Sequence, residues 1–172
     1  RDPSKGLLIT QGFFSILDLE NDMNNLWWVQ SYSIYHTINN SIKKLTAAFN
    51  ISFLTTFGDI DEVFVSWLGG AENVRGWSIP NRSIYSNLDN KFRFGNHSAV
   101  FSAELRQTII PTQVFATEFM DWKQEYGLAL VGFFDLGYIS RKKENLFSHL
   151  PMIGIGFGFR VPFPMAGTVG LD

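Results

Sequence analysis

Residues 45 to 53 read LTAAFNISF, and apolar side chains alternate with small or polar ones along this stretch. One face of an extended chain would carry Leu45, Ala47, Phe49, Ile51 and Phe53, and the other Thr46, Ala48, Asn50 and Ser52. A period of two residues predicts a β-strand, which we place at residues 43 to 56. In a soluble β-sandwich the polar face more typically carries Lys and Glu in contact with water. Small polar residues instead favour an interior into which another part of the protein packs.

The composition of the whole chain indicates a protein surface that faces lipid. Of the 172 residues, 45% are hydrophobic, 16% are aromatic and only 17% are charged, whereas a soluble domain carries about a quarter charged residues. The apolar positions are interleaved with polar ones, so no run reaches the roughly 18 apolar residues that a membrane helix requires. A closed β-barrel combines lipid exposure with alternation, because its strands satisfy one another's backbone groups.

The alternation extends over most of the chain and predicts seven strands. We expect them at residues 7 to 19, 26 to 38, 43 to 56, 98 to 108, 128 to 139, 152 to 161 and 168 to 172, with a polar turn at residues 20 to 25. The predicted fold class is all-β, a transmembrane antiparallel β-barrel. Seven strands cannot close a barrel of membrane size, so we expect the remaining strands to lie outside this sequence.

The connections between these strands fall into two groups. Tight turns at residues 39 to 43 and 162 to 167 lie at one end, and the long connection of residues 57 to 97 and the charged loop of residues 140 to 150 lie at the other. Bacterial outer-membrane barrels show this asymmetry, with short periplasmic turns and longer external loops. A further predicted connection, residues 111 to 127, is long for a periplasmic turn.

The strand predicted at residues 152 to 161 carries glycine at three successive positions of one face, namely Gly154, Gly156 and Gly158. Glycine weakens an ordinary strand, because it has no side chain to pack. We therefore expect another piece of backbone, or a plug, to lie against this face.

The long connection contains the stretch GGAENVRGW at residues 69 to 77. Its glycines permit backbone conformations that other residues resist, and functional residues concentrate on such loops. Arg75 offers a planar fork of donors suited to a carboxylate, and Trp77 is placed to anchor the loop tip against a wall. Taken alone, the same stretch also fits a mobile loop with one solvated Arg.

Several classes of function are disfavoured by the content of the sequence. The net charge is −2, the pI is near 5.9 and there is no basic cluster, so we expect no nucleic-acid partner. The absence of cysteine excludes a disulfide scaffold and thiolate metal sites. His36, His97 and His149 lie on separate predicted elements, so we expect no metal site. We also expect no cofactor and no catalytic residue within this chain.

Five short motifs follow one another along nearly the whole sequence. They are Arg1-Asp2-Pro3 with Gly6, Gly69-Gly70 followed by Val74-Arg75-Gly76-Trp77, Ala103-Glu104-Leu105-Arg106, Phe134-Asp135-Leu136-Gly137, and the glycine-rich run from Gly154 to Arg160. In this order they resemble the barrel domain of the Omp85 superfamily, also called the D15 surface-antigen family. In that family a VRGF or VRGY motif lies on a loop inserted into the barrel lumen. Trp77 departs from the usual Phe or Tyr, and the family's final strand and N-terminal periplasmic repeats are absent from this sequence.

The resemblance implies the C-terminal half of a barrel of about 16 strands in the bacterial outer membrane, with the motif loop in its lumen. The implied function is not enzymatic: it is the insertion or folding of β-barrel proteins into the outer membrane. The expected partners are the outer-membrane lipid bilayer, nascent outer-membrane or secreted protein substrates, and accessory lipoproteins. Two alternatives within the family are a two-partner-type secretion pore and a barrel that anchors a fused patatin-like phospholipase or phosphoesterase. A soluble β-sandwich is the alternative outside it.

The alternation also predicts partners for Arg75. Glu104 and Asp135 both fall on the inward faces of strands that follow the loop. Two carboxylates in a confined interior are unfavourable without a cation between them. We therefore expect Arg75 to lie buried against Asp135, with Glu104 as a second acidic neighbour.

Overall fold

The computed structural model describes residues 5–18, 23–39, 44–58, 65–80, 92–116, 123–163 and 167–171. Its main sheet contains β1 (Gly6–Asp18), β2 (Met23–Asn39), β3 (Leu45–Phe57), β6 (His97–Ala116), β7 (Lys123–Ser140), β8 (Met152–Phe163) and β9 (Gly167–Leu171), in that spatial order. Two short strands, β4 (Ser66–Trp67) and β5 (Phe94–Gly95), pair with each other in the connection between β3 and β6. The predicted all-β class and the seven predicted strands are therefore confirmed.

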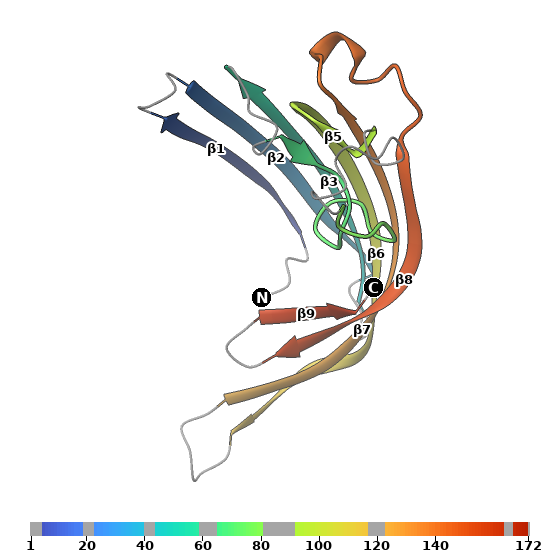
Figure 1. Cartoon of the computed structure of the whole chain (residues 1–172). Coiled ribbons are helices and arrows are strands. Elements are labelled where there is room, and N and C mark those ends of the chain that lie inside the picture. Colours follow the sequence, from blue (N-terminus) through green and yellow to red (C-terminus); the bar gives the residue numbers. More distant parts are fainter. Residues whose placement is uncertain are drawn as a thin grey trace.

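Each strand of the main sheet pairs antiparallel with its neighbour in that order (Figure 1). The sheet curves strongly, and the loop that follows β4 lies on its concave side (Figure 1). Among the residues that the structure describes, the sheet is open, with β1 and β9 at its two edges. Because side chains alternate along a strand, one parity of β6, β7 and β8 is directed toward the loop.

Burial follows the predicted alternation most clearly on β7 and β8. Val131 and Asp135 are fully buried, whereas Phe134 between them is 41% exposed. On β8, Ile155 and Phe157 are 78% and 75% exposed. The convex face of the sheet carries many exposed apolar side chains: Phe49, Ile51, Leu105, Leu130, Phe134, Ile153, Ile155, Phe157 and Phe159. The faces predicted for these two strands are confirmed.

The predicted connection at residues 111 to 127 is wrong, because both neighbouring strands continue through much of it. β6 extends to Ala116, and β7 already begins at Lys123. The register between the two strands shifts twice between Thr108 and Gln113. Such bulges leave a residue of one strand unpaired, and they accommodate Pro111, which has no N–H to donate. The bulges interrupt the alternation, so the sequence pattern ends the first of these strands too early and begins the second too late.

Other differences in the strand bounds are smaller. The predicted polar turn at residues 20 to 25 is wrong in its second half, because β2 begins at Met23. The long connection is not wholly irregular, since it contains β4 and β5. Residues 1–4, 40–43 and 164–166, which hold the predicted entry motif and most of the two tight turns, lie outside the described residues.

The longer connections lie at the same end of the sheet, as the sequence predicts. The backbone N–H of Thr56 donates to the carbonyl of Asn96 at 2.8 Å, and the N–H of Asn96 donates to the carbonyl of Ser140 at 2.9 Å. These bonds link the ends of β3 and β7 to the residue that precedes β6. The loop after β7 contains a single 3₁₀ turn, Lys143–Asn145. No helix in the described part of the chain has the length and apolarity needed to cross a membrane.

Candidate functional site

The motif loop, which we define as residues 68 to 78, is a closed turn on the concave side of the sheet. The N–H of Gly70 donates to the carbonyl of Trp77 at 2.7 Å and closes the turn. Gly69, Gly70 and Gly76 have φ values of +125°, +92° and +85°. These backbone angles strain residues that carry a Cβ, so the three glycines are required by the shape of the loop.

Arg75 and Asp135 form a buried, bidentate ion pair. The Nε of Arg75 lies 2.7 Å from Oδ2 of Asp135, and Nη2 lies 2.7 Å from Oδ1. The backbone N–H of Arg75 also donates to Oδ2, at 3.1 Å. Arg75 is 6% exposed and Asp135 is fully buried. The structure thus brings together Arg75 and Asp135, the two residues that the alternation along the strands predicts as partners.

The guanidinium of Arg75 remains charged in this environment. Burial alone would lower its pKa. The hydrogen bond to Asp135 and the negative charges of Glu104 and Asp135 outweigh that effect and raise the pKa of Arg75 above its ordinary range. The geometry of the pair is the parallel fork that makes Arg a stronger carboxylate partner than Lys.

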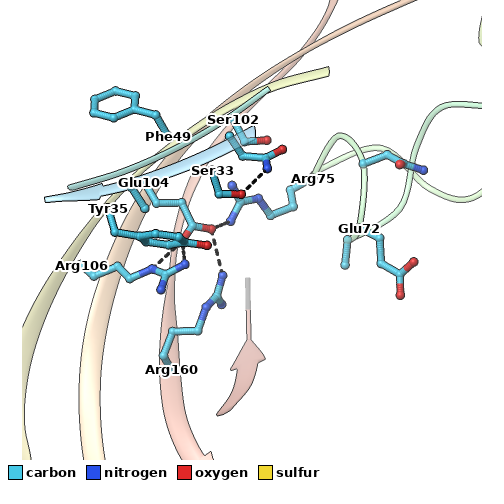
Figure 2. Close-up of a pocket in the computed structure, with 13 residues that line it drawn as sticks. Ser33, Tyr35, Phe49, Glu72, Arg75, Ser102, Glu104, Arg106 and Arg160 are labelled. Carbon is cyan, nitrogen blue, oxygen red and sulfur yellow. Dashed lines mark hydrogen bonds and ion pairs between the residues drawn. The ribbon is translucent and has the colours of Figure 1, made fainter. Parts of the chain in front are cut away.

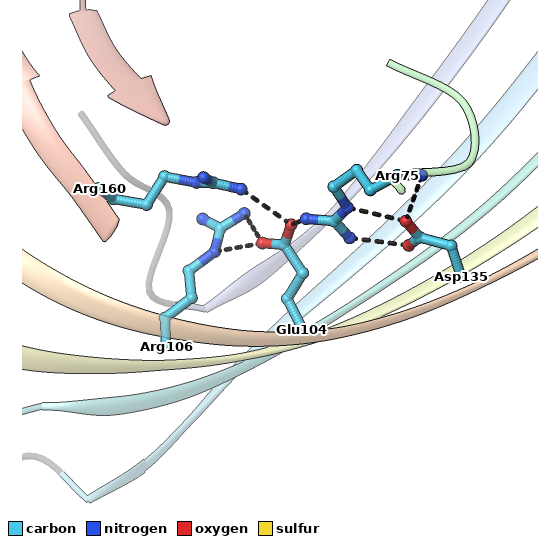
Figure 3. Close-up of polar contacts among 5 residues, drawn as sticks. All are labelled: Arg75, Glu104, Arg106, Asp135 and Arg160. Carbon is cyan, nitrogen blue, oxygen red and sulfur yellow. Dashed lines mark hydrogen bonds and ion pairs between the residues drawn. The ribbon is translucent and has the colours of Figure 1, made fainter. Parts of the chain in front are cut away.

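Glu104, on β6, accepts hydrogen bonds from three arginines (Figure 3). Nη1 of Arg75 donates to Oε1. Arg106 donates to Oε2 through Nε at 2.7 Å and Nη2 at 2.6 Å, and Nη2 of Arg160 lies 3.3 Å from Oε1. With Asp135 on β7 and Arg160 on β8, this ionic network connects the motif loop to three neighbouring strands. Removal of Arg75 would leave the fully buried Asp135 without its cation, which is costly.

The guanidinium of Arg75 packs against the ring of Phe133, and Gly156 leaves space for that ring. The Cζ of Arg75 lies 3.9 Å from the centroid of the Phe133 ring, a cation–π contact. Gly156 lies against the end of this ring, since a Cβ at that position would lie 2.7 Å from Cζ of Phe133. Gly156 therefore acts on Arg75 through Phe133, by leaving space for the ring.

The loop backbone itself rests on Gly154. A Cβ at Gly154 would lie 2.2 Å from the carbonyl oxygen of Arg75. This contact confirms the expectation that another piece of backbone lies against the glycine face of β8. Gly158 is buried on the same face, opposite Val131 and further from the loop end of the strand.

Apolar contacts also hold the motif loop against the sheet. Val74 is fully buried and Leu68 is 2% exposed. They pack with Val100, Ile139 and Met152, and Trp77 lies against this cluster. Gly137 provides the space for them, because a Cβ there would lie 2.5 Å from Val74 and 2.9 Å from Leu68. The loop is thus held by burial of apolar surface as well as by charge.

Trp77 contacts the sheet through its indole N–H. Nε1 donates to the carbonyl of Ile153 on β8 at 2.8 Å. The ring also packs edge to face against Phe92, with centroids 6.2 Å apart. Of the four motif residues, Val74, Arg75 and Trp77 therefore contact the sheet, whereas Gly76 is exposed and supplies the turn.

Arg93 is a loop-positioning residue that the sequence pattern does not reveal. It is 6% exposed, and its guanidinium donates to the carbonyls of Leu68, at 3.3 Å, and of Ser78. Arg93 therefore joins the two ends of the motif loop. A Cβ at Gly69 would lie 2.2 Å from Nη2 of Arg93. The only sequence signal is an Arg between two Phe residues in a polar connection, which specifies no partner.

A polar cavity of about 260 Å³ adjoins the network on the concave side (Figure 2). Its lining includes the charged residues Arg75, Glu104, Arg106, Arg160 and Glu72, and the small polar residues Ser33, Asn50 and Ser102. Nδ2 of Asn50 donates to Oγ of Ser31 at 2.9 Å and to Oγ of Ser33 at 2.7 Å. The small polar face predicted for residues 43 to 56 therefore lines a space beside the docked loop.

Within the described ranges, no group of His, Cys, Asp and Glu side chains is arranged to hold a metal ion. Comparisons of the chain with protein-family models, with curated proteins and with solved structures found no match.

Proposed function

We propose that this chain forms part of the transmembrane β-barrel of an Omp85-type factor that inserts or folds β-barrel proteins into the bacterial outer membrane. In this proposal the convex face of the sheet contacts lipid and the concave face lines the lumen. The motif loop then lies inside the barrel. The chain supplies no catalytic residue, and its partners are the bilayer and nascent outer-membrane or secreted proteins.

The observation that carries the proposal is the contrast between the two faces of one sheet. The convex face exposes Phe49, Ile155, Phe157 and other apolar side chains. The concave face carries a buried ionic network, a polar cavity and a docked loop. A sheet that is apolar outside and polar inside is the pattern of outer-membrane barrels. A soluble protein would expose a convex apolar surface of this extent at a cost in solubility.

The docked loop supports the Omp85-type branch of the proposal. Arg75 reaches the wall from a loop that leaves the sheet after β3 and returns at β6, and it links β6, β7 and β8 through Glu104, Asp135 and Arg160. Such an ionic network can hold three strands of a barrel together while other parts of the barrel open. The order of the five sequence motifs agrees with this interpretation.

Reconstitution tests the proposal directly. The complete barrel of which this chain forms a part, inserted into lipid vesicles, should accelerate the folding of an unfolded outer-membrane β-barrel substrate relative to empty vesicles. Arg75→Ala should reduce this acceleration, and Arg141→Ala, which alters an exposed Arg outside the network, should leave it unchanged. Vesicle insertion without acceleration of substrate folding would exclude an insertase and favour a pore or an anchoring barrel.

A further inference from the structure

A row of aromatic side chains crosses the convex face near the end that carries the longer connections. Phe53 of β3 contacts Phe101 of β6 edge to face, and Phe101 contacts Tyr138 of β7, with centroids 6.3 Å apart in each pair. Phe147, in the loop between β7 and β8, extends this row, with its ring centroid 5.0 Å from that of Tyr138. The loop is therefore packed onto the convex face at its tip.

The same loop exposes cations and apolar side chains together. Lys142 and Lys143 are exposed, and Phe147 and Leu150 are 59% and 95% exposed. The loop backbone is held by a 3₁₀ turn and by the bond from the N–H of Ser148 to the carbonyl of Asn145, at 3.1 Å. The combination of exposed lysine and exposed aromatic or aliphatic side chains is typical of segments at a membrane surface.

We propose that the loop of residues 142 to 150 docks on the bilayer surface around the barrel, where Lys142 and Lys143 bind the phosphate headgroups of anionic lipids. Phe147 and Leu150 insert between the headgroups. The inference rests on the proposed membrane barrel and adds a lipid-binding surface to it.

Charge and continuity support a lipid headgroup as the occupant. The chain has a net charge of −2, yet this loop carries two adjacent exposed lysines, so the attraction to anions is local. Phe147 continues the aromatic row on the face that would contact lipid, and aromatic residues concentrate at the headgroup level of a bilayer. Basic residues close to this level attract anionic lipids.

A fluorophore at residue 148 tests this surface, because the chain has no cysteine that would compete for the label. The Ser148→Cys variant is labelled with the fluorophore and reconstituted in nanodiscs. The nanodisc lipids carry a nitroxide quencher on the headgroup. Quenching by nitroxide-labelled phosphatidylglycerol should exceed quenching by nitroxide-labelled phosphatidylcholine. Lys142→Ser and Lys143→Ser should each reduce this preference about fivefold. Lys44→Ser, a control at an exposed lysine beyond the other end of the sheet, should retain it.

A second probe separates this inference from the proposed function. A fluorophore on Phe157→Cys, on the convex face, should be quenched by a nitroxide on the lipid acyl chain. If Phe157 is quenched and residue 148 is not, the loop does not contact the bilayer and the inference fails while the barrel stands. If neither probe is quenched, the membrane barrel fails and the inference fails with it. Equal quenching by phosphatidylglycerol and phosphatidylcholine overturns the assignment of an anionic headgroup. The assignment also fails if inorganic phosphate abolishes the preference for phosphatidylglycerol and sodium chloride of matched ionic strength does not.

Discussion

Asp135 accepts three hydrogen bonds from Arg75, two from its guanidinium and one from its backbone N–H. The side-chain bonds fix the position of the charge, and the backbone bond fixes the position of the loop at the same residue. Asp135 thus specifies where the chain of the motif loop lies as well as where its cation points.

This relationship predicts strong coupling between the two residues. Arg75→Ala and Asp135→Ala should each lower the free energy of unfolding by about 3 kcal/mol or more, because each leaves a buried charge without its partner. The double variant should lose much less than the sum, since it removes both charges together. The measurement is denaturant unfolding of the protein in vesicles. Additive losses would show that the pairing contributes nothing and that the apolar cluster alone holds the loop.

Gly154 should be intolerant of a methyl group. Gly154→Ala places a Cβ 2.2 Å from the carbonyl oxygen of Arg75, so the loop or the strand must shift, at a cost of about 1–3 kcal/mol. Gly132→Ala is the matched control, because a Cβ there has no atom within 4 Å. Thermal unfolding followed by electrophoretic mobility compares the two. Equal stability of both variants would mean that the loop does not rest on β8.

Most of what the sequence can predict follows from the alternation of apolar and polar residues along the strands. It places the strands, assigns Asp135 and Glu104 to the inward faces, and marks the glycine face of β8 as a surface of close approach. These are consequences of the two-residue period of a strand, which requires no knowledge of the tertiary contacts.

The remaining features depend on contacts that no local pattern contains. The continuation of β6 past Pro111 requires two bulges, and a bulge reverses the alternation from which a strand is identified. Phe133 reads as an ordinary inward apolar residue, and its contact with the Arg75 guanidinium exists only once the loop has docked. Arg93 acquires its partners in the same way, from two carbonyls that the closed loop brings together.

The convex face should reject charge at its centre. Phe157→Arg should impair folding into bilayers by about 2–4 kcal/mol if the residue lies near the midplane. Ile79→Arg, at an exposed apolar residue just after the motif loop, is the control with the same chemistry. The readout is the free energy of folding into lipid vesicles. Normal folding of Phe157→Arg would count against a membrane barrel.

The two ends of the sheet should differ in their access to a label applied outside the cell. Lys143 lies in the loop after β7 and Lys44 lies just before β3, at opposite ends of the strands. A cysteine at residue 143 should react with a membrane-impermeant reagent on intact cells, and a cysteine at residue 44 should react only after lysis. The opposite result would reverse the proposed orientation.

Arg93 should control the shape of the motif loop without affecting the ion pair of Arg75. Its guanidinium donates to the carbonyls of Leu68 and Ser78, and Cζ lies 5.7 Å from the centroid of the Trp77 ring. Hydrogen bonds from a charged donor contribute about 1.5–3 kcal/mol, so Arg93→Ala should destabilise the loop by an amount in that range. Amide hydrogen exchange in residues 68 to 78 should accelerate, while exchange in β7 beside Asp135 should change little.

Two comparisons make the Arg93 prediction specific. Arg93→Lys keeps the charge but cannot donate to both carbonyls from a planar fork, so it should restore little of the protection from exchange. Arg141→Ala removes an exposed Arg outside the loop and should leave the exchange unchanged. If Arg93→Ala leaves the exchange of residues 68 to 78 at the parental rate, the ends of the loop are held by the bond between Gly70 and Trp77 instead.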